Sequence, residues 1–130
     1  MNLLLDTHVW LWGLLEPERI SKKAREALLA PDAEVHLSPI SVFEALLLVE
    51  RGRVRVPGSA ASFVKGALGA GLFIEAPLTV PVAMESRRLA IDVADPADRF
   101  LAATAAVYGL TFVTADRRLR RIPGVRILRA

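Results

Sequence analysis

The sequence contains no cysteine among its 130 residues and only two histidines, His8 and His36. The absence of cysteine excludes disulfide bonds, thiolate metal sites and a thiol nucleophile. Any bound metal ion must therefore be held by oxygen atoms or by these two imidazoles, and an oxygen-rich donor set favours hard cations.

Long apolar runs are absent as well. The most apolar region, "ALGAGLFIEAPLTVPVAM", is interrupted by Glu75, Pro77 and Pro81, so it predicts separate short elements and no membrane span. The first residues, "MNLLLDTH", lack a basic segment and reach Asp6 after three leucines, which is unlike a signal peptide. We therefore expect a cytoplasmic protein without membrane contact. Neither an internal repeat nor a low-complexity tail is present.

Acidic residues are missing from the C-terminal end. The net charge is only +3, but the fourteen residues after Asp116 contain no acid. They include six arginines: Arg117, Arg118, Arg120, Arg121, Arg126 and Arg129. A polyanion could bind to this basic segment. An alanine- and arginine-rich composition with solvated side chains would produce the same pattern, and the sequence leaves both interpretations open.

The apolar pattern predicts alternating strands and helices within one domain, residues 1–130. A hydrophobic content of 53% gives a chain of this length enough apolar surface for one core. Short apolar runs predict strands over 2–5, 34–38, 72–76, 110–114 and 125–129. Amphipathic or capped segments predict helices over 7–15, 21–30 with Ser21 as cap, 41–51 with Ser41 as cap, 59–71, 79–91 and 96–108. This order predicts an α/β fold, a three-layer α/β/α sandwich with a mainly parallel central sheet.

The same topology predicts that four acidic side chains meet at one edge of the sheet. Helices that follow or precede a parallel strand begin at the carboxyl edge of the sheet. Asp6 ends the first strand, and Asp116 follows the strand at 110–114 by two residues. Glu44 and Asp98 are each expected in the first turn of a helix that begins at this edge. Open α/β sheets bind their ligands there, which makes these four acids candidate site residues.

Helix capping offers another explanation for each acid taken alone. The caps and first-turn acids would be Asp6, the Ser41–Glu44 capping box, Asp95 with Asp98 after Pro96, and Asp116. Taken together, four acids crowded at one edge repel each other and raise each other's pKa unless cations neutralise them. A divalent metal ion resolves this conflict.

Mg²⁺ or Mn²⁺ suits a cluster of carboxylates, hydroxyls and water. Such an ion activates a water molecule and stabilises charge on a phosphate and its departing oxygen. The reaction that suits this cluster is therefore phosphodiester hydrolysis, without a covalent nucleophile.

Basic residues near these acids predict further contacts. Arg117 and Arg118 follow Asp116 directly and are candidates for contact with substrate phosphates. Arg99 is expected to pair with Asp95 or to contact a phosphate, and the ion pair is favoured. These assignments depend on side-chain orientation, which the sequence does not give.

The two histidines are expected to be structural. His8 is close to Asp6, but a divalent oxygen cluster does not need an imidazole, and a lone histidine is more often structural. His36 lies in an apolar strand pattern and is expected in the core or on a strand face.

The helix at 7–15 carries two tryptophans on different sides. Trp10 and Trp12 point about 200° apart around a helix with 3.6 residues per turn, so one of them should face outward. A helix that is apolar all round is either fully buried or presents a surface to another chain. Both alternatives remain open.

Four segments resemble the successive signatures of PIN-domain toxins of the VapC type: "LLLDTHVWLW", "LSPISVFEALLLVERG", "DPADRFLAATA" and "LTFVTAD". They follow the family's order and spacing and span almost the whole chain. The resemblance implies one PIN domain over residues 1–130 and a Mg²⁺-dependent endoribonuclease, with Mn²⁺ as a substitute ion. The acidic quartet, catalytic and metal-binding, would be Asp6, Glu44, Asp98 and Asp116.

The resemblance also implies supporting residues and partners. Asp95 would support the quartet from the "DPxDR" element, and the hydroxyl of Thr114 in "VTAD" would support the metal or its water. The family further implies an RNA substrate, a homodimer, and a VapB-like antitoxin that lays an amphipathic segment over a hydrophobic groove near the active site. DNA binding by the pair would belong to the antitoxin.

Two other functions fit the same residues. One is a noncatalytic module that binds nucleic acid or a protein partner through this edge and its arginines. The other is a PIN nuclease that acts on DNA or in RNA maturation. Cleavage assays on RNA and on single-stranded DNA distinguish these functions from a ribonuclease toxin.

Overall fold

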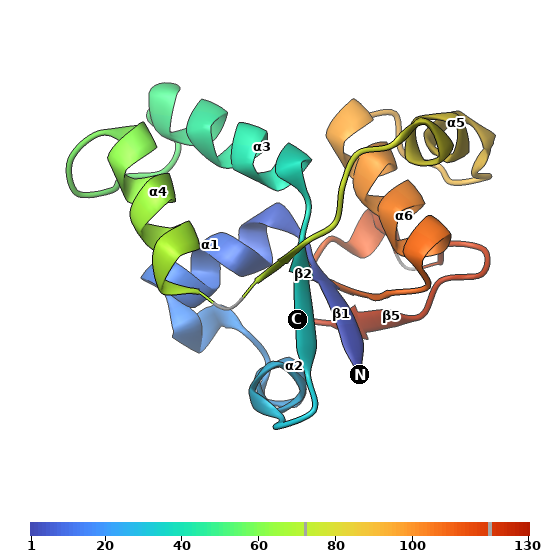
Figure 1. Ribbon diagram of the computed structural model, residues 1–130, viewed down its shortest axis with the longest axis horizontal. Coiled ribbons are helices and arrows are strands. Elements are labelled where there is room, and N and C mark those ends of the chain that lie inside the picture. Colours follow the sequence, from blue (N-terminus) through green and yellow to red (C-terminus); the bar gives the residue numbers. More distant parts are fainter. Residues whose placement is uncertain (72, 120) are drawn as a thin grey trace.

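The computed structural model describes residues 1–71, 73–119 and 121–130, and Figure 1 shows the arrangement of their elements. In chain order these are β1 (Asn2–Leu5), α1 (Thr7–Leu15), the 3₁₀ turn η1 (Pro17–Arg19), α2 (Lys22–Leu29), β2 (Glu34–Leu37), α3 (Pro39–Glu50), α4 (Ala60–Ala70), β3 (Ile74–Glu75), α5 (Val80–Arg88), α6 (Pro96–Tyr108), β4 (Thr111–Thr114), the 3₁₀ turn η2 (Arg117–Leu119) and β5 (Ile127–Arg129). Two residues of the predictions lie outside the described residues: Leu72 of the expected strand 72–76, and Arg120 of the basic segment.

The strands form one sheet in the order β3-β2-β1-β4-β5, and every neighbouring pair is parallel. The first strand, β1, is the central strand; β2 and β3 follow on one side of it, and β4 and β5 lie on its other side. The strand order therefore reverses between β1 and β4. Open α/β sheets bind ligands beyond the carboxyl ends of the strands at such a switch point.

Helices cover both faces of this sheet, as the sequence predicts. Figure 1 shows α1 to α4 on one side of the strands and α5 with α6 on the other. Two buried clusters correspond to these layers, because one contains residues of α1 to α4 and the other contains residues of α5 and α6. The predicted three-layer α/β/α sandwich is confirmed.

The central strand β1 contributes to both cores. Leu3 and Leu5 pack with the helices of one face, and Leu4 packs with α5 and α6 on the other. Successive side chains of a strand point to opposite faces, so a strand buried on both sides needs a continuous apolar sequence. Full burial of a leucine contributes roughly 1.5–3 kcal/mol. The leucines of "NLLL" therefore anchor β1 between the two cores, and this anchoring fixes the position of Asp6 at the carboxyl edge of the sheet.

Helix α6 has the predicted bounds. The side chain of Asp95 accepts a hydrogen bond from the backbone N–H of Asp98 (3.1 Å), and Pro96 occupies the first helical position. The helix ends at Gly109, whose φ of 66° is left-handed and disfavours a residue with a side chain. Local signals at both ends therefore fix this helix in the sequence.

Helix α3 begins earlier than predicted, so the expected cap at Ser41 is wrong. Ser38 is the N-cap, and its hydroxyl accepts a hydrogen bond from the backbone N–H of Ile40 (3.1 Å). Pro39 follows, and its fixed φ favours the first turn of a helix. Ser41 is buried one turn further on, and Glu44 lies in the second turn rather than the first.

Several other elements are shorter than predicted. The strands expected over 72–76 and 125–129 are observed at Ile74–Glu75 and Ile127–Arg129, and the helix expected over 79–91 ends at Arg88. Among the described residues, no helix has the combination of length and apolar character that crossing a bilayer requires.

Candidate active site

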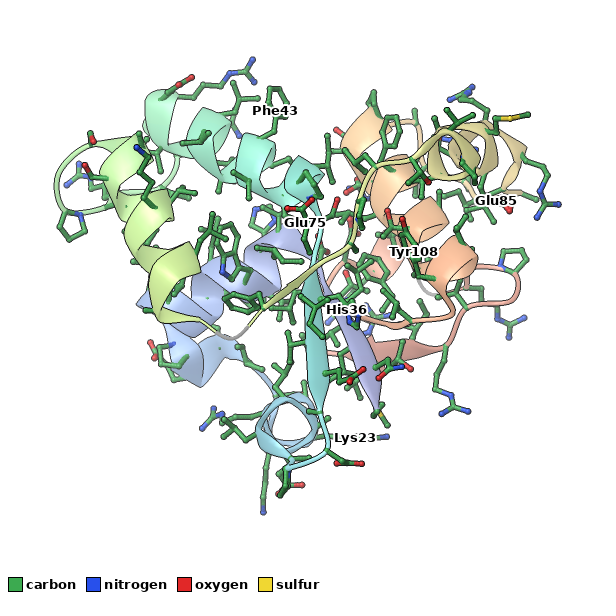
Figure 2. The ribbon with its side chains drawn as sticks, in the orientation of Figure 1. Lys23, His36, Phe43, Glu75, Glu85 and Tyr108 are labelled. Atoms are coloured by element: carbon green, nitrogen blue, oxygen red, sulfur yellow. The ribbon has the colours of Figure 1, made fainter. Side chains whose placement is uncertain are left out.

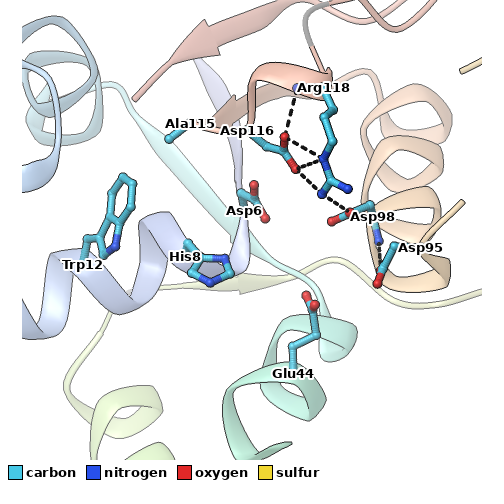
Figure 3. Close-up of a pocket in the computed structure, with 9 residues that line it drawn as sticks. All are labelled: Asp6, His8, Trp12, Glu44, Asp95, Asp98, Ala115, Asp116 and Arg118. Atoms are coloured by element: carbon cyan, nitrogen blue, oxygen red, sulfur yellow. Dashed lines mark hydrogen bonds and ion pairs between the residues drawn. The ribbon is translucent and has the colours of Figure 1, made fainter. Parts of the chain in front are cut away.

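A pocket of about 330 Å³ lies at the carboxyl edge of the sheet, beyond the ends of β1 and β4 (Figure 3). The acids that line it are Asp6, Glu44, Asp95, Asp98 and Asp116, and Arg118 lies among them. The fold thus brings the four acids of the expected quartet into one pocket from β1, α3, α6 and the segment after β4. Their catalytic and metal-binding roles remain predictions.

Asp6 is buried, with 5% of its surface exposed. Its Oδ1 accepts a hydrogen bond from the backbone N–H of Thr7 (2.8 Å), and its Oδ2 accepts one from the hydroxyl of Thr114 (2.6 Å). Burial raises the pKa of Asp6 above its ordinary value, and the Thr114 hydrogen bond opposes this effect. Thr114 therefore fixes the orientation of Asp6 across the switch point between β1 and β4.

Glu44 is positioned by two buried hydroxyls. The Thr7 hydroxyl donates a hydrogen bond to Oε1 of Glu44 (2.5 Å) and lies 2.9 Å from the hydroxyl of Ser41. Because a hydroxyl carries one proton, Thr7 donates to Glu44 and accepts from Ser41. Burial is the main cause that raises the pKa of Glu44, and the Thr7 hydrogen bond lowers it. The sequence pattern predicts Ser41 only as a helix cap and assigns no role to Thr7, although each stands close in sequence to a predicted acid.

Asp98 lies in the first turn of α6, and its side chain is 14% exposed. Its pKa is raised to about 7, mainly because burial removes water from the carboxylate. Neighbouring negative charges raise it further, in decreasing order those of Asp95, Asp6 and Glu44. Asp95 is therefore both the cap of α6 and a source of repulsion in the pocket.

Asp116 is paired with Arg118. The guanidinium of Arg118 donates to both oxygens of Asp116, most closely to Oδ2 at 2.7 Å, and it also donates to Oδ2 of Asp98 at 3.2 Å. The Arg118 hydrogen bonds hold the pKa of Asp116 below its ordinary value. The hydroxyl of Thr114 accepts a hydrogen bond from the backbone N–H of Asp116 (3.0 Å), so one threonine supports two of the acids.

The donor chemistry of this pocket fits a hard divalent cation. Carboxylates dominate the lining, and oxygen donors of this kind suit such a cation. Burial is the main cause that raises the pKa of three of them, and repulsion from neighbouring carboxylates adds to it. Within residues 1–71, 73–119 and 121–130, no three carboxylates or imidazoles are gathered tightly enough to hold one ion in this conformation. The guanidinium of Arg118, between Asp98 and Asp116, is the positive charge that the pocket contains.

Arg99 does not play either expected role, and both predictions for it are wrong. Its side chain is buried (8% exposed) and donates hydrogen bonds of 2.7–3.2 Å to four backbone carbonyl groups. The acceptors are the carbonyl oxygens of Ser86, Leu89, Ile91 and Val93. One residue along a helix is a turn of about 100°, so Arg99 faces α5 while Asp98 faces the pocket. Arg99 thus fastens the irregular segment after α5 to α6.

The two histidines and Arg117 lie in different surroundings. His8 is exposed and lines the pocket, whereas Arg117 is exposed outside its lining. Nδ1 of His36 lies 3.2 Å from the carbonyl oxygen of Leu3, in keeping with a structural histidine on a strand.

The two tryptophans face different environments. Trp10 is buried in the core, whereas Trp12 is only half-buried and lines the pocket, so the prediction that one indole faces outward is confirmed.

Comparisons with known proteins agree with this fold and site. Residues 3–125 match the PIN domain family, and the chain therefore belongs to that family. Ribonuclease VapC22 from Mycobacterium tuberculosis (strain ATCC 25618 / H37Rv) is 34% identical over 124 residues, which cover 92% of this chain and 90% of that protein. This similarity confirms the resemblance to PIN-domain toxins of the VapC type.

Solved structures share the same fold. VapBC2 from Rickettsia felis, bound to a DNA fragment from its promoter, aligns with a TM-score of 0.74 and 16% identity over 100% of this chain and 99% of that chain. VapBC-5 from Mycobacterium tuberculosis, a member of the VapBC family of toxin-antitoxin systems, aligns with a TM-score of 0.65 and 20% identity over 99% of this chain and 98% of that chain. At these identities the likeness demonstrates the fold alone.

Proposed function

We propose that this chain is a metal-dependent endoribonuclease, the toxin of a VapBC-type pair, which hydrolyses RNA phosphodiesters in the cytoplasm. The observation that carries the proposal is the convergence of Asp6, Glu44, Asp98 and Asp116 in one pocket at the switch point of the sheet. The similarity to Ribonuclease VapC22 supports the ribonuclease activity.

The same four acids would hold Mg²⁺, or Mn²⁺ in its place. When bound, such an ion lowers the pKa of a coordinated water and neutralises charge on the attacked phosphate. Thr114 keeps Asp6 pointed into the pocket, and Thr7 does the same for Glu44. Asp95 holds the first turn of α6 in place and thereby positions Asp98.

The basic residues after β4 would bind the substrate backbone. Arg118 already lies in the pocket with 64% of its side chain exposed, so its guanidinium is accessible to a phosphate. Arg117 is exposed beside it and would contact a neighbouring phosphate. Both arginines counter the repulsion between a polyanionic RNA and the acidic pocket.

We further propose a VapB-like antitoxin and a homodimer as partners. The similar structures from Rickettsia felis and Mycobacterium tuberculosis are VapBC assemblies, which supports the antitoxin. Large apolar side chains are exposed on α3 and α5: Phe43 (57%), Val80 (72%) and Met84 (70%). Figure 2 shows Phe43 extending outward from α3.

Cleavage of a structured RNA by the purified protein tests the proposal. We expect cleavage with Mg²⁺ or Mn²⁺, loss of cleavage with EDTA, and a decrease on the order of a hundredfold in Asp98→Asn. Asp92→Asn is the matched control, because Asp92 is exposed and lies outside the pocket lining. Intact RNA with a folded, RNA-binding protein would indicate a noncatalytic module. Preferential cleavage of single-stranded DNA in a parallel assay would indicate a nuclease with another substrate.

A further inference from the structure

A second hollow, the Trp12 groove, adjoins the acidic pocket. It has a volume of about 650 Å³ and lies between α1, η1 and the segment after α3. His8 and Trp12 line both the groove and the pocket, so the two hollows lie side by side. Any extended ligand whose reacting group reaches the acids has room to continue along this groove.

The charge of the Trp12 groove is opposite to that of the pocket. Its charged lining residues are Arg19, Arg53, Arg55 and Glu16. Glu16 is paired with Arg19 at 3.3 Å. Within the described part of the chain, the exposed side chains of Arg53 and Arg55 form neither an ion pair nor a hydrogen bond. The groove therefore presents two available guanidinium groups to a polyanion.

These arginines are carried by an anchored segment. The backbone N–H groups of Arg53 and Val54 both donate to the carbonyl oxygen of Leu48, at 2.9 and 3.3 Å. Val54 packs partly into the core of that face. The two guanidinium groups thus extend from a backbone that is fixed to the end of α3.

Trp12 is the aromatic surface of the groove. The guanidinium of Arg19 lies over its ring, 4.3 Å from the ring centre, a cation–π contact that orients the indole. Because Arg19 covers one face of the ring, an unpaired base would stack on the opposite face of this half-buried tryptophan, since every base has a π-face. Bases inside a duplex are not available for such stacking.

We propose that the Trp12 groove binds a single-stranded segment of RNA, with one base stacked on Trp12 and neighbouring phosphates held by Arg53 and Arg55. The proposal extends the proposed ribonuclease function by assigning a substrate subsite beside the acids. The charge of the groove and its position beside the pocket favour a nucleic acid over an amphipathic protein segment.

Tryptophan fluorescence provides the first test, in EDTA so that no cleavage occurs. Trp10 is buried against Phe73, with ring centres 6.4 Å apart, whereas Trp12 is partly exposed. Quenching by a short single-stranded RNA should persist in Trp10→Phe and disappear in Trp12→Phe. The indole N–H of Trp10 has no hydrogen-bond partner in the described residues, so the control substitution breaks no hydrogen bond.

Binding of the same RNA with a fluorescein label, measured by anisotropy, provides the second test. We expect affinity roughly tenfold weaker in Trp12→Ala and largely retained in Trp12→Phe, because phenylalanine also stacks on a base. The double variant Arg53→Gln/Arg55→Gln should bind more weakly. The slope of log affinity against log salt concentration should become shallower by about 0.7 for each arginine removed. Arg87→Gln on α5, across the sheet, is the matched control and should bind as the wild type does.

Wild-type quenching in Trp12→Phe, or wild-type affinity in both Trp12→Ala and the double arginine variant, would overturn the proposal. The double arginine variant keeps the test decisive if Trp12→Ala does not fold. RNA cleavage is measured separately with Mg²⁺. If the protein cleaves RNA but the groove variants bind RNA as the wild type does, the subsite is ruled out and the ribonuclease function stands. If the groove variants bind more weakly but the wild type cleaves no RNA, the ribonuclease function is ruled out and the subsite stands.

Discussion

The guanidinium of Arg118 lies 3.2 Å from Oδ2 of Asp98 while it also binds Asp116. A side chain of this protein therefore occupies the space between two acids that are proposed to hold a metal ion. A guanidinium and a divalent cation compete for the same carboxylate oxygens, since both are stabilised by the same negative charge.

Replacement of Arg118 should consequently strengthen metal binding. We expect Arg118→Ala to bind Mn²⁺ about twofold to fivefold more tightly, a modest change because the ion pair is largely exposed to water. Isothermal titration calorimetry measures this directly. Arg117→Ala is the control, because Arg117 is exposed outside the pocket. Equal or weaker Mn²⁺ binding by Arg118→Ala would show that Arg118 does not compete with the ion.

The raised pKa of Asp98 predicts how the stability of the metal-free protein depends on pH. The folded-state pKa is about 7, against an ordinary value of 3.8, so the folded protein holds a proton that the unfolded chain releases. The contribution of Asp98 to stability is therefore full below about pH 4 and is lost as the pH rises to about 7. The raised pKa values of Asp6 and Glu44 act in the same direction. The lowered pKa of Asp116 acts in the opposite direction, at pH values below its ordinary pKa.

Urea unfolding in EDTA measures this effect. Between about pH 5 and pH 8, the free energy of unfolding should fall in the wild type and fall less in Asp98→Asn, by a difference on the order of 2 kcal/mol. Saturating Mg²⁺ should restore wild-type stability at the higher pH, because the ion binds the folded state. Parallel pH profiles for the wild type and Asp98→Asn would mean that Asp98 is ionised normally.

How far the sequence predicts this molecule depends on whether the relevant signals are local. Helix α6 has the expected bounds because Asp95, Pro96 and Gly109 specify its ends. The convergence of the acids follows from parallel topology, which fixes one edge of the sheet for all of them. The predicted start of α3 is wrong because Ser38 and Ser41 are both possible caps, and the signal that favours Ser38 is Pro39, which suits the first helical position.

Side-chain contacts that depend on tertiary packing could not be predicted from the sequence. Arg99 binds backbone carbonyl groups of an irregular segment, and carbonyl groups exist at every residue, so no pattern marks them. The hydrogen bond from Thr7 to Glu44 joins two helices that are far apart in sequence. Such contacts depend on packing distances of a few ångströms, which element order does not determine.

Thr114 connects β4 to Asp6, and its removal should affect stability and activity together. Thr114→Val keeps the shape of the side chain but leaves the buried carboxylate of Asp6 without the 2.6 Å hydrogen bond. We expect a loss of roughly 1–3 kcal/mol in the free energy of unfolding. RNA cleavage with Mg²⁺ should decrease about tenfold, because Asp6 loses its fixed orientation.

The conservative variant separates hydrogen bonding from packing. Thr114→Ser retains the hydroxyl and should restore most of the cleavage, while it loses one buried methyl group. Cleavage rates are compared at saturating Mn²⁺, with unfolding curves for each variant. If Thr114→Val cleaves as fast as the wild type, Thr114 does not position Asp6 for the reaction.

Arg99 should contribute to stability rather than to substrate binding. Arg99→Met removes every hydrogen bond to the segment after α5 and leaves buried carbonyl groups unpaired, at a cost on the order of 2–4 kcal/mol. Arg99→Lys should recover little of this, because an ammonium group cannot reproduce the planar fork of donors that reaches four acceptors. Urea unfolding measures the decrease in the free energy of unfolding of both variants. Where they remain folded, their affinity for labelled RNA, measured by anisotropy, should equal that of the wild type. Weakened RNA binding at unchanged stability would instead place Arg99 on a substrate phosphate, contrary to its buried position.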